Sequence, residues 1–238
     1  MHKTAAVFVT FRMPSDTAGT NPEFVRAPSR GAAEATIRPM QQLRDSVRLR
    51  AGSLILFVGL MWFVWLLDAI APGTGSAAGV GIVPRSWDGL DGIPVAPFIH
   101  ASFEHLLSNS VPLLILGALI LLRGVPEFVF VILVSALVAG VGTWLFASGD
   151  GQHVGASGVV FGFFGYLVFR TAFDRRLSSA VITLIVAGAY GTAMAYSLVP
   201  QAMISWSGHF FGFIGGFMAA RFRYPARPQR TRTASFEA

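Results

Sequence analysis

The sequence contains no cysteine, a single lysine and few charged residues of any kind. Without cysteine the chain offers neither a disulfide nor a thiolate, which excludes a disulfide scaffold, a cysteine nucleophile and a cysteine-ligated metal. Only 13% of its 238 residues are charged, whereas soluble domains carry about 25%. The charges gather in residues 1–50 and 221–238, and long apolar runs fill the part between them. This distribution is typical of a polytopic membrane protein.

The charge that remains is basic, with a formal net charge of +6 and a pI of about 10.7. The arginines lie beside the apolar runs, which favours anchoring at a membrane surface over binding to nucleic acid. We therefore expect the lipid bilayer as a partner and no nucleic acid.

Six apolar runs are long enough to cross a bilayer, which takes about 20 residues. They cover residues 51–71, 105–122, 126–147, 155–173, 177–198 and 205–221. The sequence thus predicts an all-α fold, a bundle of six transmembrane helices over residues 51–221. Residues 1–50 are polar and interrupted by prolines, which predicts a disordered tail, and residues 222–238 form a second, basic tail. The first run lacks a cleavage pattern after it and is expected to be retained.

The arginines also predict the orientation. The two tails and the turns at 122–126 and 170–177 hold every basic residue except Arg85, which lies in the connection 72–104. The positive-inside rule then places both termini in the cytoplasm of a multi-pass protein of the plasma or inner membrane. The connection 72–104 is unusually long, and its Gly, Pro and aromatic residues, Trp87 and Phe98 among them, indicate a structured element at the membrane interface.

Polar residues inside the predicted spans need partners, because an unpaired polar group in lipid costs several kcal/mol. Ser157 opens the fourth span within Gly155-Ala156-Ser157-Gly158. The free N–H groups of a first helical turn would stabilise an oxyanion formed there. The same motif is also compatible with a helix cap and close helix packing.

His209 lies near the start of the sixth span and shares a face with Gly212 and Gly216. The fourth span carries glycines near Ser157, and small residues let two helices approach closely. Ser157 and His209 could therefore come within hydrogen-bond reach. The alternative is a histidine that serves packing alone.

The second span carries His105 and Asn109 one turn apart, with His100 just before them. Imidazole and carboxamide are hydrogen-bond donors that could hold an oxyanion near Ser157. Zinc bound by three histidines, with His153 as an additional ligand, and hydrogen bonds between helices are the alternatives. Zinc is disfavoured because no acidic or cysteine ligand recurs at ligand spacing.

Taken in order, these three groups resemble the rhomboid family of intramembrane serine proteases. The matching segments are His100-Ala-Ser-Phe-Glu-His105-Leu-Leu-Ser-Asn109, Gly155-Ala-Ser157-Gly158-Val-Val-Phe161-Gly162 and His209-Phe-Phe-Gly212-Phe-Ile-Gly-Gly216. The resemblance covers about residues 51–221. It implies that Ser157 is the nucleophile and His209 its general base. It also implies that His105 and Asn109, with the Ser157 N–H, hold the oxyanion.

The same resemblance assigns supporting roles. Phe161 matches an aromatic position that packs on the catalytic imidazole, and His100 is expected to hold the long connection. Gly155 and Gly158 complete the serine motif, while Gly212 and Gly216 match close-approach glycines. The family's Trp-Arg pair has only a loose counterpart in Pro84-Arg85-Ser86-Trp87, which stays unassigned.

The resemblance implies transmembrane protein substrates, entry past the fifth predicted span and no cofactor or metal, and it leaves the oligomeric state open. With no carboxylate near His209 in the predicted spans, it implies a dyad rather than a triad. Two alternatives remain. The first is a rhomboid-like protein that binds membrane segments without cutting them. The second is a small transporter, although such proteins commonly place a carboxylate within the membrane.

Overall fold

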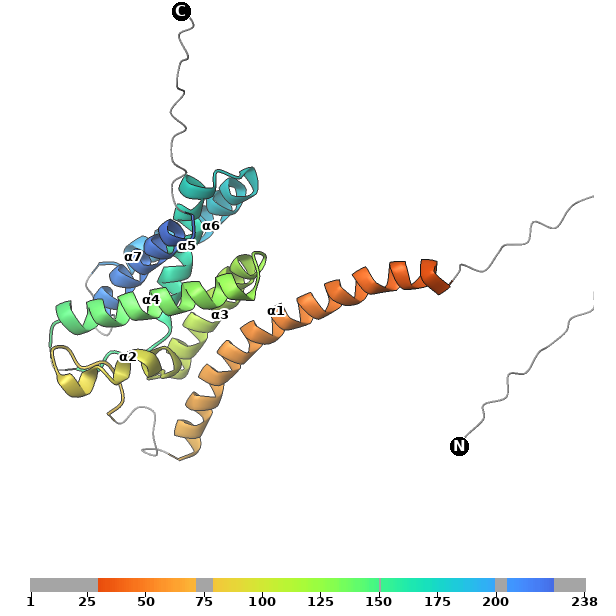
Figure 1. Cartoon of the computed structure of the whole chain (residues 1–238). Helices are drawn as coiled ribbons and strands as arrows, with labels where there is room; N and C mark the ends of the chain where they lie inside the picture. Colours follow the sequence, from red (N-terminus) through yellow and green to blue (C-terminus); the bar gives the residue numbers. More distant parts are fainter. Residues whose placement is uncertain (1–29, 72–78, 150, 200–204, 225–238) are drawn as a thin grey trace, which may run out of the picture. The chain divides into compact units, whose positions relative to one another are not determined.

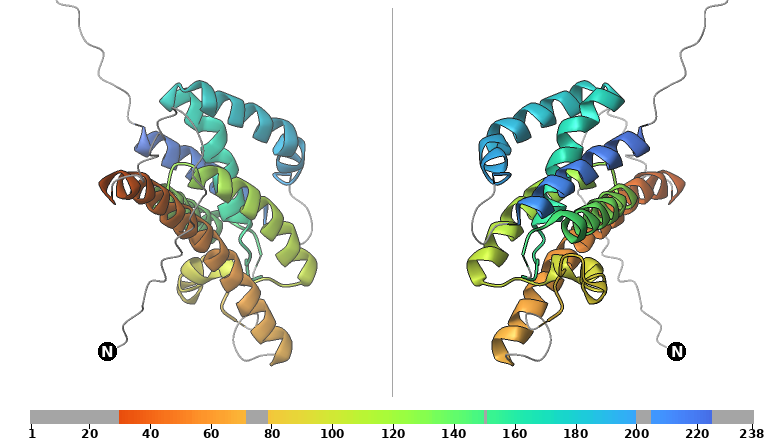
Figure 2. Two further views of the ribbon diagram at one scale, coloured as in Figure 1. Left: turned by 90° about the vertical axis from the view of Figure 1, so that its right-hand side faces the viewer. Right: turned by 90° about the vertical axis from the view of Figure 1, so that its left-hand side faces the viewer.

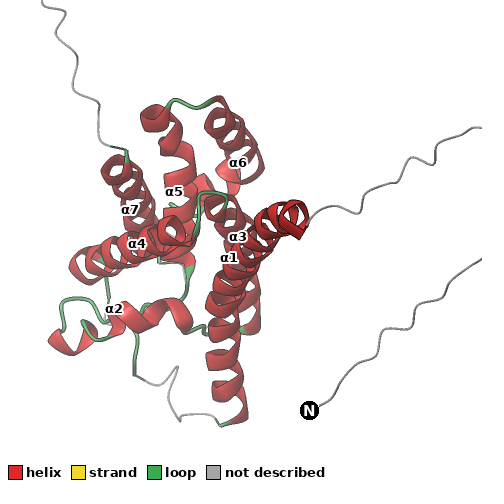
Figure 3. Ribbon diagram, turned by 45° about the vertical axis from the view of Figure 1, so that its right-hand side comes forward, coloured by secondary structure: helices red, strands yellow, loops and turns green. Residues whose placement is uncertain are grey.

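The computed structural model describes residues 30–71, 79–149, 151–199 and 205–224. Within these residues the chain is helical and contains no strand (Figure 3). The long helices, labelled in Figure 1, are α1 (Arg30–Ile70), α3 (Phe103–Leu121), α4 (Val125–Phe146), α5 (Ser157–Asp174), α6 (Leu177–Tyr196) and α7 (Trp206–Arg223). Each of these long helices overlaps one of the six predicted spans. Three short helices lie between α1 and α3: η1 (Trp87–Gly89), α2 (Gly92–Val95) and η2 (Ala96–Phe98).

Helix α1 corrects one prediction, because it begins at Arg30 and not near residue 51. Residues 30–50 are therefore helical rather than disordered, although Pro39 lies among them. An apolar helix already formed from residue 51 onward spares this stretch the cost of nucleation, and its Ala, Arg, Gln and Leu residues are good helix formers. The rest of the predicted N-terminal tail and nearly all of the C-terminal tail lie outside the described residues.

The chain divides into two units, Met1–Leu43 and Arg44–Ala238. The first is described only from residue 30, as the beginning of α1. Four helical segments of the described residues are long and apolar enough to cross a membrane, fewer than the six spans that were predicted. They are Pro39–Ile70, which starts in the first unit, together with the helices α3, α4 and α6.

Among the long helices of the described residues, α5 has the largest buried share, and α7 packs along it (Figure 2). Glycines bring the two backbones together: a Cβ added to Gly212 would overlap the Gly158 carbonyl, and one added to Gly216 would overlap Gly162. Dispersion contacts of this kind replace the hydrophobic effect as the force between helices in lipid. The close packing predicted for these glycines is therefore present.

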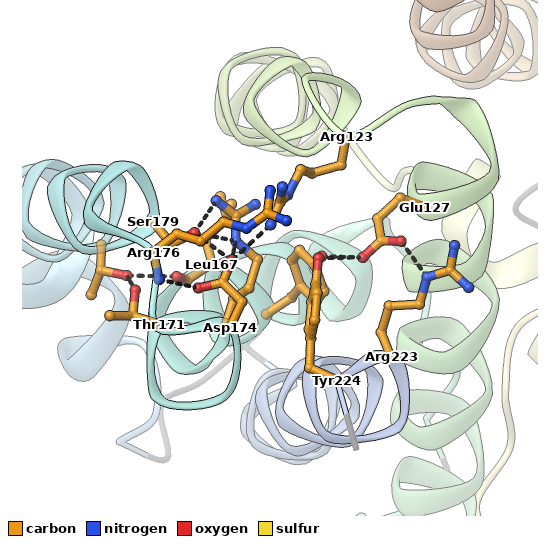
Figure 4. Close-up of polar contacts among 12 residues, drawn as sticks. Arg123, Glu127, Leu167, Thr171, Asp174, Arg176, Ser179, Arg223 and Tyr224 are labelled. Atoms are coloured by element: carbon orange, nitrogen blue, oxygen red, sulfur yellow. Dashed lines mark hydrogen bonds and ion pairs between the residues drawn. The ribbon is translucent and has the colours of Figure 1, made fainter. Parts of the chain in front are cut away.

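Polar residues join the helices at the end of α5 that lies away from Ser157 (Figure 4). The first group centres on Asp174, which pairs with Arg123 at 2.7 Å and accepts a hydrogen bond from Ser179 at 2.5 Å. The second centres on the buried Glu127, which pairs with Arg223 at 2.5 Å and accepts a hydrogen bond from Tyr166. Together they connect the starts of α4 and α6 to the ends of α5 and α7.

The long connection after α1 is structured from residue 79 onward, as its composition predicted. It is attached to the end of α4 by three hydrogen bonds. The Arg85 N–H donates to the Trp144 carbonyl at 3.0 Å. The Arg85 guanidinium donates to the Ala147 carbonyl at 2.6 Å, and the Trp144 indole donates to the Ser86 carbonyl at 2.7 Å. Residues 72–78 of this connection lie outside the described residues.

Candidate active site

Ser157 is the first residue of α5, so its N–H belongs to the free donors of the first helical turn. The backbone just before it is held by the long connection at three successive points. Ile82 and His153 exchange two backbone hydrogen bonds of 3.0 and 2.9 Å. Gly155 donates to the Ala96 carbonyl at 2.8 Å, and Ala156 donates to the ring of His100. The connection therefore sets the path along which the chain enters α5.

His100 lies at the end of the long connection and contacts the backbone just before Ser157. Its Nε2 atom accepts the hydrogen bond from the Ala156 N–H, at 3.3 Å. Burial, helped by the neighbouring His105, lowers the pKa of His100 to about 4. The ring is therefore neutral at physiological pH, which leaves the lone pair on Nε2 that this hydrogen bond requires.

His105 and Asn109 lie one turn apart at the start of α3, as predicted. The His105 ring occupies the space where a Cβ of Gly155 would lie, and its centroid is 5.1 Å from that of His100. Gly155 also has a φ of +114°, a region that residues with a side chain avoid. The Asn109 amide donates one hydrogen bond to the His105 carbonyl at 2.8 Å, which leaves its second hydrogen for another acceptor.

His209 lies in the first turn of α7 and is 8% exposed. Its ring stacks on Phe161 of α5, with centroids 4.2 Å apart and planes inclined by 8°. Its Nδ1 atom lies 2.9 Å from the carbonyl oxygen of Ser197, the residue that caps the end of α6. Two contacts from two different helices thus fix the ring.

One cavity of about 1070 Å³ brings the predicted residues together. Ser157, His209, His105 and Asn109 all line it. In the described part of the chain no hydrogen bond joins the Ser157 hydroxyl to the His209 ring. Catalytic hydrogen bonds are often long in an enzyme without substrate and tighten when substrate binds.

The histidines that the zinc alternative requires are not arranged around one point in the described residues. Among the described residues no group of three or more His, Asp and Glu side chains is placed to hold a metal ion. His153 instead makes a hydrogen bond of 2.8 Å to the hydroxyl of Ser205, the N-cap residue of α7. Burial lowers the pKa of His153, so this ring is neutral at physiological pH. His153 therefore connects the loop before Ser157 to the start of the helix that carries His209.

Sequence reasoning missed three features of this site: the Ser197 carbonyl, the pair His153 and Ser205, and the backbone contacts of the long connection. The first and third are made largely by main-chain atoms, which every residue has, so the residue types do not predict them. The pair of side chains had a weak signal, since His153 was noted only as a possible additional zinc ligand.

Comparison with known proteins shows the family to which this chain belongs. The family model described as the rhomboid domain matches residues 92–226, which is more than half of the chain. The chain belongs to the rhomboid family, and its apolar helices make it an integral membrane protein.

The chain is also similar to individual proteins, one of which is described as a rhomboid protease. The chain is 37% identical over 177 residues to the uncharacterized protein Rv1337 of Mycobacterium tuberculosis (strain ATCC 25618 / H37Rv), covering 71% of this chain and 72% of the relative. It is 32% identical over 194 residues to the uncharacterized protein ML1171 of Mycobacterium leprae (strain TN), covering 77% and 76%. It is also 28% identical over 128 residues to the rhomboid protease GluP of Bacillus subtilis (strain 168), covering 51% and 24%.

Proposed function

We propose that this protein is an intramembrane serine endopeptidase in which Ser157 is the nucleophile and His209 the general base. The observation that carries the proposal is the shared cavity: side chains from α5 and α7 meet there with two hydrogen-bond donors from α3. Membership of the rhomboid family, whose members are typically intramembrane serine proteases, supports it.

The reaction begins with transfer of the Ser157 proton to His209, because an un-ionised hydroxyl is a weak nucleophile. The serine oxygen attacks the carbonyl carbon of the substrate peptide bond and forms a tetrahedral oxyanion. His209 then gives its proton to the leaving nitrogen, and the C–N bond breaks. The acyl-enzyme that remains is hydrolysed by water, which His209 deprotonates in turn.

The oxyanion is held by donors from two helices. The Ser157 N–H lies at the start of α5, and the side chains of His105 and Asn109 lie at the start of α3. Removal of one such donor typically lowers the rate about 10²- to 10³-fold. Asn109 is 4% exposed and already held by its bond to the His105 carbonyl, so it can stabilise charge without first being ordered.

The topology that accompanies this function is six transmembrane helices with both termini in the cytoplasm. The arginines of the connections and tails support it, and the active-site cavity then opens toward the outer face. The substrates are transmembrane segments whose backbone is locally unwound, since a helical peptide bond is shielded by its own hydrogen bonds. Entry past α6 agrees with the cavity lining, which includes Tyr190, Ala193 and Met194 of that helix.

Cleavage of a transmembrane reporter in liposomes tests the proposal. The full-length protein is compared with Ser157→Ala and His209→Ala, and each is also treated with a fluorophosphonate that labels an activated serine. We expect cleavage and labelling in the wild type and neither in the two variants. Cleavage that persists in both variants, or a folded wild type that neither cuts nor labels, would contradict the proposal. The second outcome would favour the non-catalytic alternative.

A further inference from the structure

The hydrogen bond between His209 and the Ser197 carbonyl determines where the imidazole proton lies. A carbonyl oxygen accepts hydrogen bonds and donates none, so Nδ1 at 2.9 Å must carry the hydrogen. A neutral imidazole has one N–H, and Nε2 is then left with a lone pair. Nε2 is then the atom that can take the proton of a serine hydroxyl.

The ring has little freedom to turn away from this arrangement. Phe161 covers one face, its plane inclined by only 8° to that of the imidazole. The ring is 8% exposed, and within the described part of the chain no carboxylate contacts it. The only acceptor that the described residues present to Nδ1 is a main-chain oxygen.

We propose that the Ser197 carbonyl is the orienting group of His209 and takes the place that a carboxylate holds in a catalytic triad. The inference rests on the proposed function, in which His209 is the base. Ser197 is a positioning residue, because it acts through the imidazole and not on the substrate. A neutral acceptor sets the tautomer as a carboxylate does but gives less stabilisation to the imidazolium.

The position of Ser197 connects this role to α6. In its first two turns α6 makes side-chain hydrogen bonds to α5, through Ser179 to Asp174 at 2.5 Å and through Thr183 to the Leu167 carbonyl at 2.8 Å. At its other end Ser197 caps the helix and meets the base. A displacement of this end of α6 would withdraw the acceptor, so the position of α6 controls the tautomer of His209.

Nitrogen NMR on the full-length protein tests the proposal directly. The protein is labelled with ¹⁵N-histidine and placed in lipid nanodiscs, and His209→Gln identifies the His209 signals. We expect a protonated Nδ1 and an unprotonated Nε2, whereas an unconstrained neutral histidine prefers the opposite form. The Nε2–H tautomer in the wild type would overturn the proposal. Because this measurement needs no substrate, it tests the tautomer of His209 independently of the proteolytic function.

A backbone variant tests the consequence for catalysis. The residue before a proline avoids the helical region, and Ser197 has φ −74° and ψ −6°, so Leu198→Pro should turn the Ser197 carbonyl away. Leu198→Ala is the matched control that shortens the same side chain and leaves the backbone free. Loss of a triad carboxylate lowers kcat about 10⁴-fold, and a neutral acceptor should contribute less, about 10- to 100-fold.

We expect Leu198→Pro to lower kcat with little change in KM and to shift His209 toward the Nε2–H tautomer, while Leu198→Ala keeps both. A lower kcat without a change of tautomer would overturn the proposal, as would a changed tautomer with kcat intact. If Leu198→Pro fails to fold, the wild-type spectrum decides. If the wild type shows the expected tautomer but cleaves nothing, the hydrogen bond stands and the proteolytic function fails.

Discussion

The Phe161 ring lies flat on the His209 imidazole, with ring centroids 4.2 Å apart. Stacked aromatic pairs contribute about 0.5–1.5 kcal/mol beyond their burial. Replacing Phe161 with Leu fills a similar volume but removes the flat surface, so we expect labelling of Ser157 by a fluorophosphonate to slow about 2- to 10-fold. Phe161→Tyr keeps the stack and should react at the wild-type rate. Equal rates in all three proteins would show that the stack does not hold the base.

His100 should make the protein sensitive to acid. Burial lowers its pKa to about 4 in the folded chain, whereas an unfolded chain has the ordinary value of about 6.5. Above pH 6.5 the His100 ring is neutral in both the folded and the unfolded chain, and its full contribution to stability is present. As the pH falls from 6.5 to 4 the unfolded chain binds a proton that the folded chain does not, which lowers the free energy of unfolding by up to about 3 kcal/mol.

The comparison is with His100→Gln, whose amide oxygen can accept from the Ala156 N–H but does not titrate. Denaturation followed between pH 7 and pH 4 should show a steeper loss of stability in the wild type than in this variant. Parallel curves would mean that His100 titrates alike in both states.

Gly212 should tolerate no side chain. A Cβ there would overlap the Gly158 carbonyl, and overpacking of this kind costs about 1–3 kcal/mol. Gly212→Ala should therefore lower the thermal stability of the protein in detergent. Gly191 in α6 is the matched control, because a Cβ there meets nothing within 4 Å, and Gly191→Ala should be neutral or slightly stabilising. Similar melting temperatures for the two variants would contradict the close contact of α5 and α7.

Truncation of Glu127 and truncation of Arg223 should lower the stability of the protein by different amounts. The Glu127 side chain is 5% exposed and that of Arg223 is 50% exposed. Glu127→Ala leaves the buried hydroxyl of Tyr166 without this acceptor, which costs about 1–3 kcal/mol. Arg223→Ala should cost less, because water reaches that end of the pair. Unfolding measured for both variants checks the order, and an equal or reversed order would contradict it.

The positions of the long helices could be predicted from the sequence because lipid imposes a simple rule on length and composition. The predicted start of α1 was too late, since the rule finds the apolar part of a helix and not its polar extension from Arg30. The placement of Ser157, His105, Asn109 and His209 around one cavity followed from recognisable motifs at the starts of three helices.

The rest of the site depends on atoms that every residue has. The carbonyls of Ser197 and Ala96 would be present whatever side chains stood there, so no motif reveals them. The pairing of Glu127 with Arg223 joins residues far apart in the chain, and hydropathy does not show which charges meet. Such contacts become visible only once the helices are placed in space.

The contact of Gly212 with Gly158 limits how this protein can change. The obstacle to a methyl group on α7 is a main-chain oxygen of α5, and no replacement at position 158 removes that atom. A destabilising substitution at Gly212 should therefore have no suppressor mutation among its neighbours. Relieving the overlap would require α7 to move as a whole away from α5. The helices that carry Ser157 and His209 are thus held in register by a position at which no single nearby substitution can compensate.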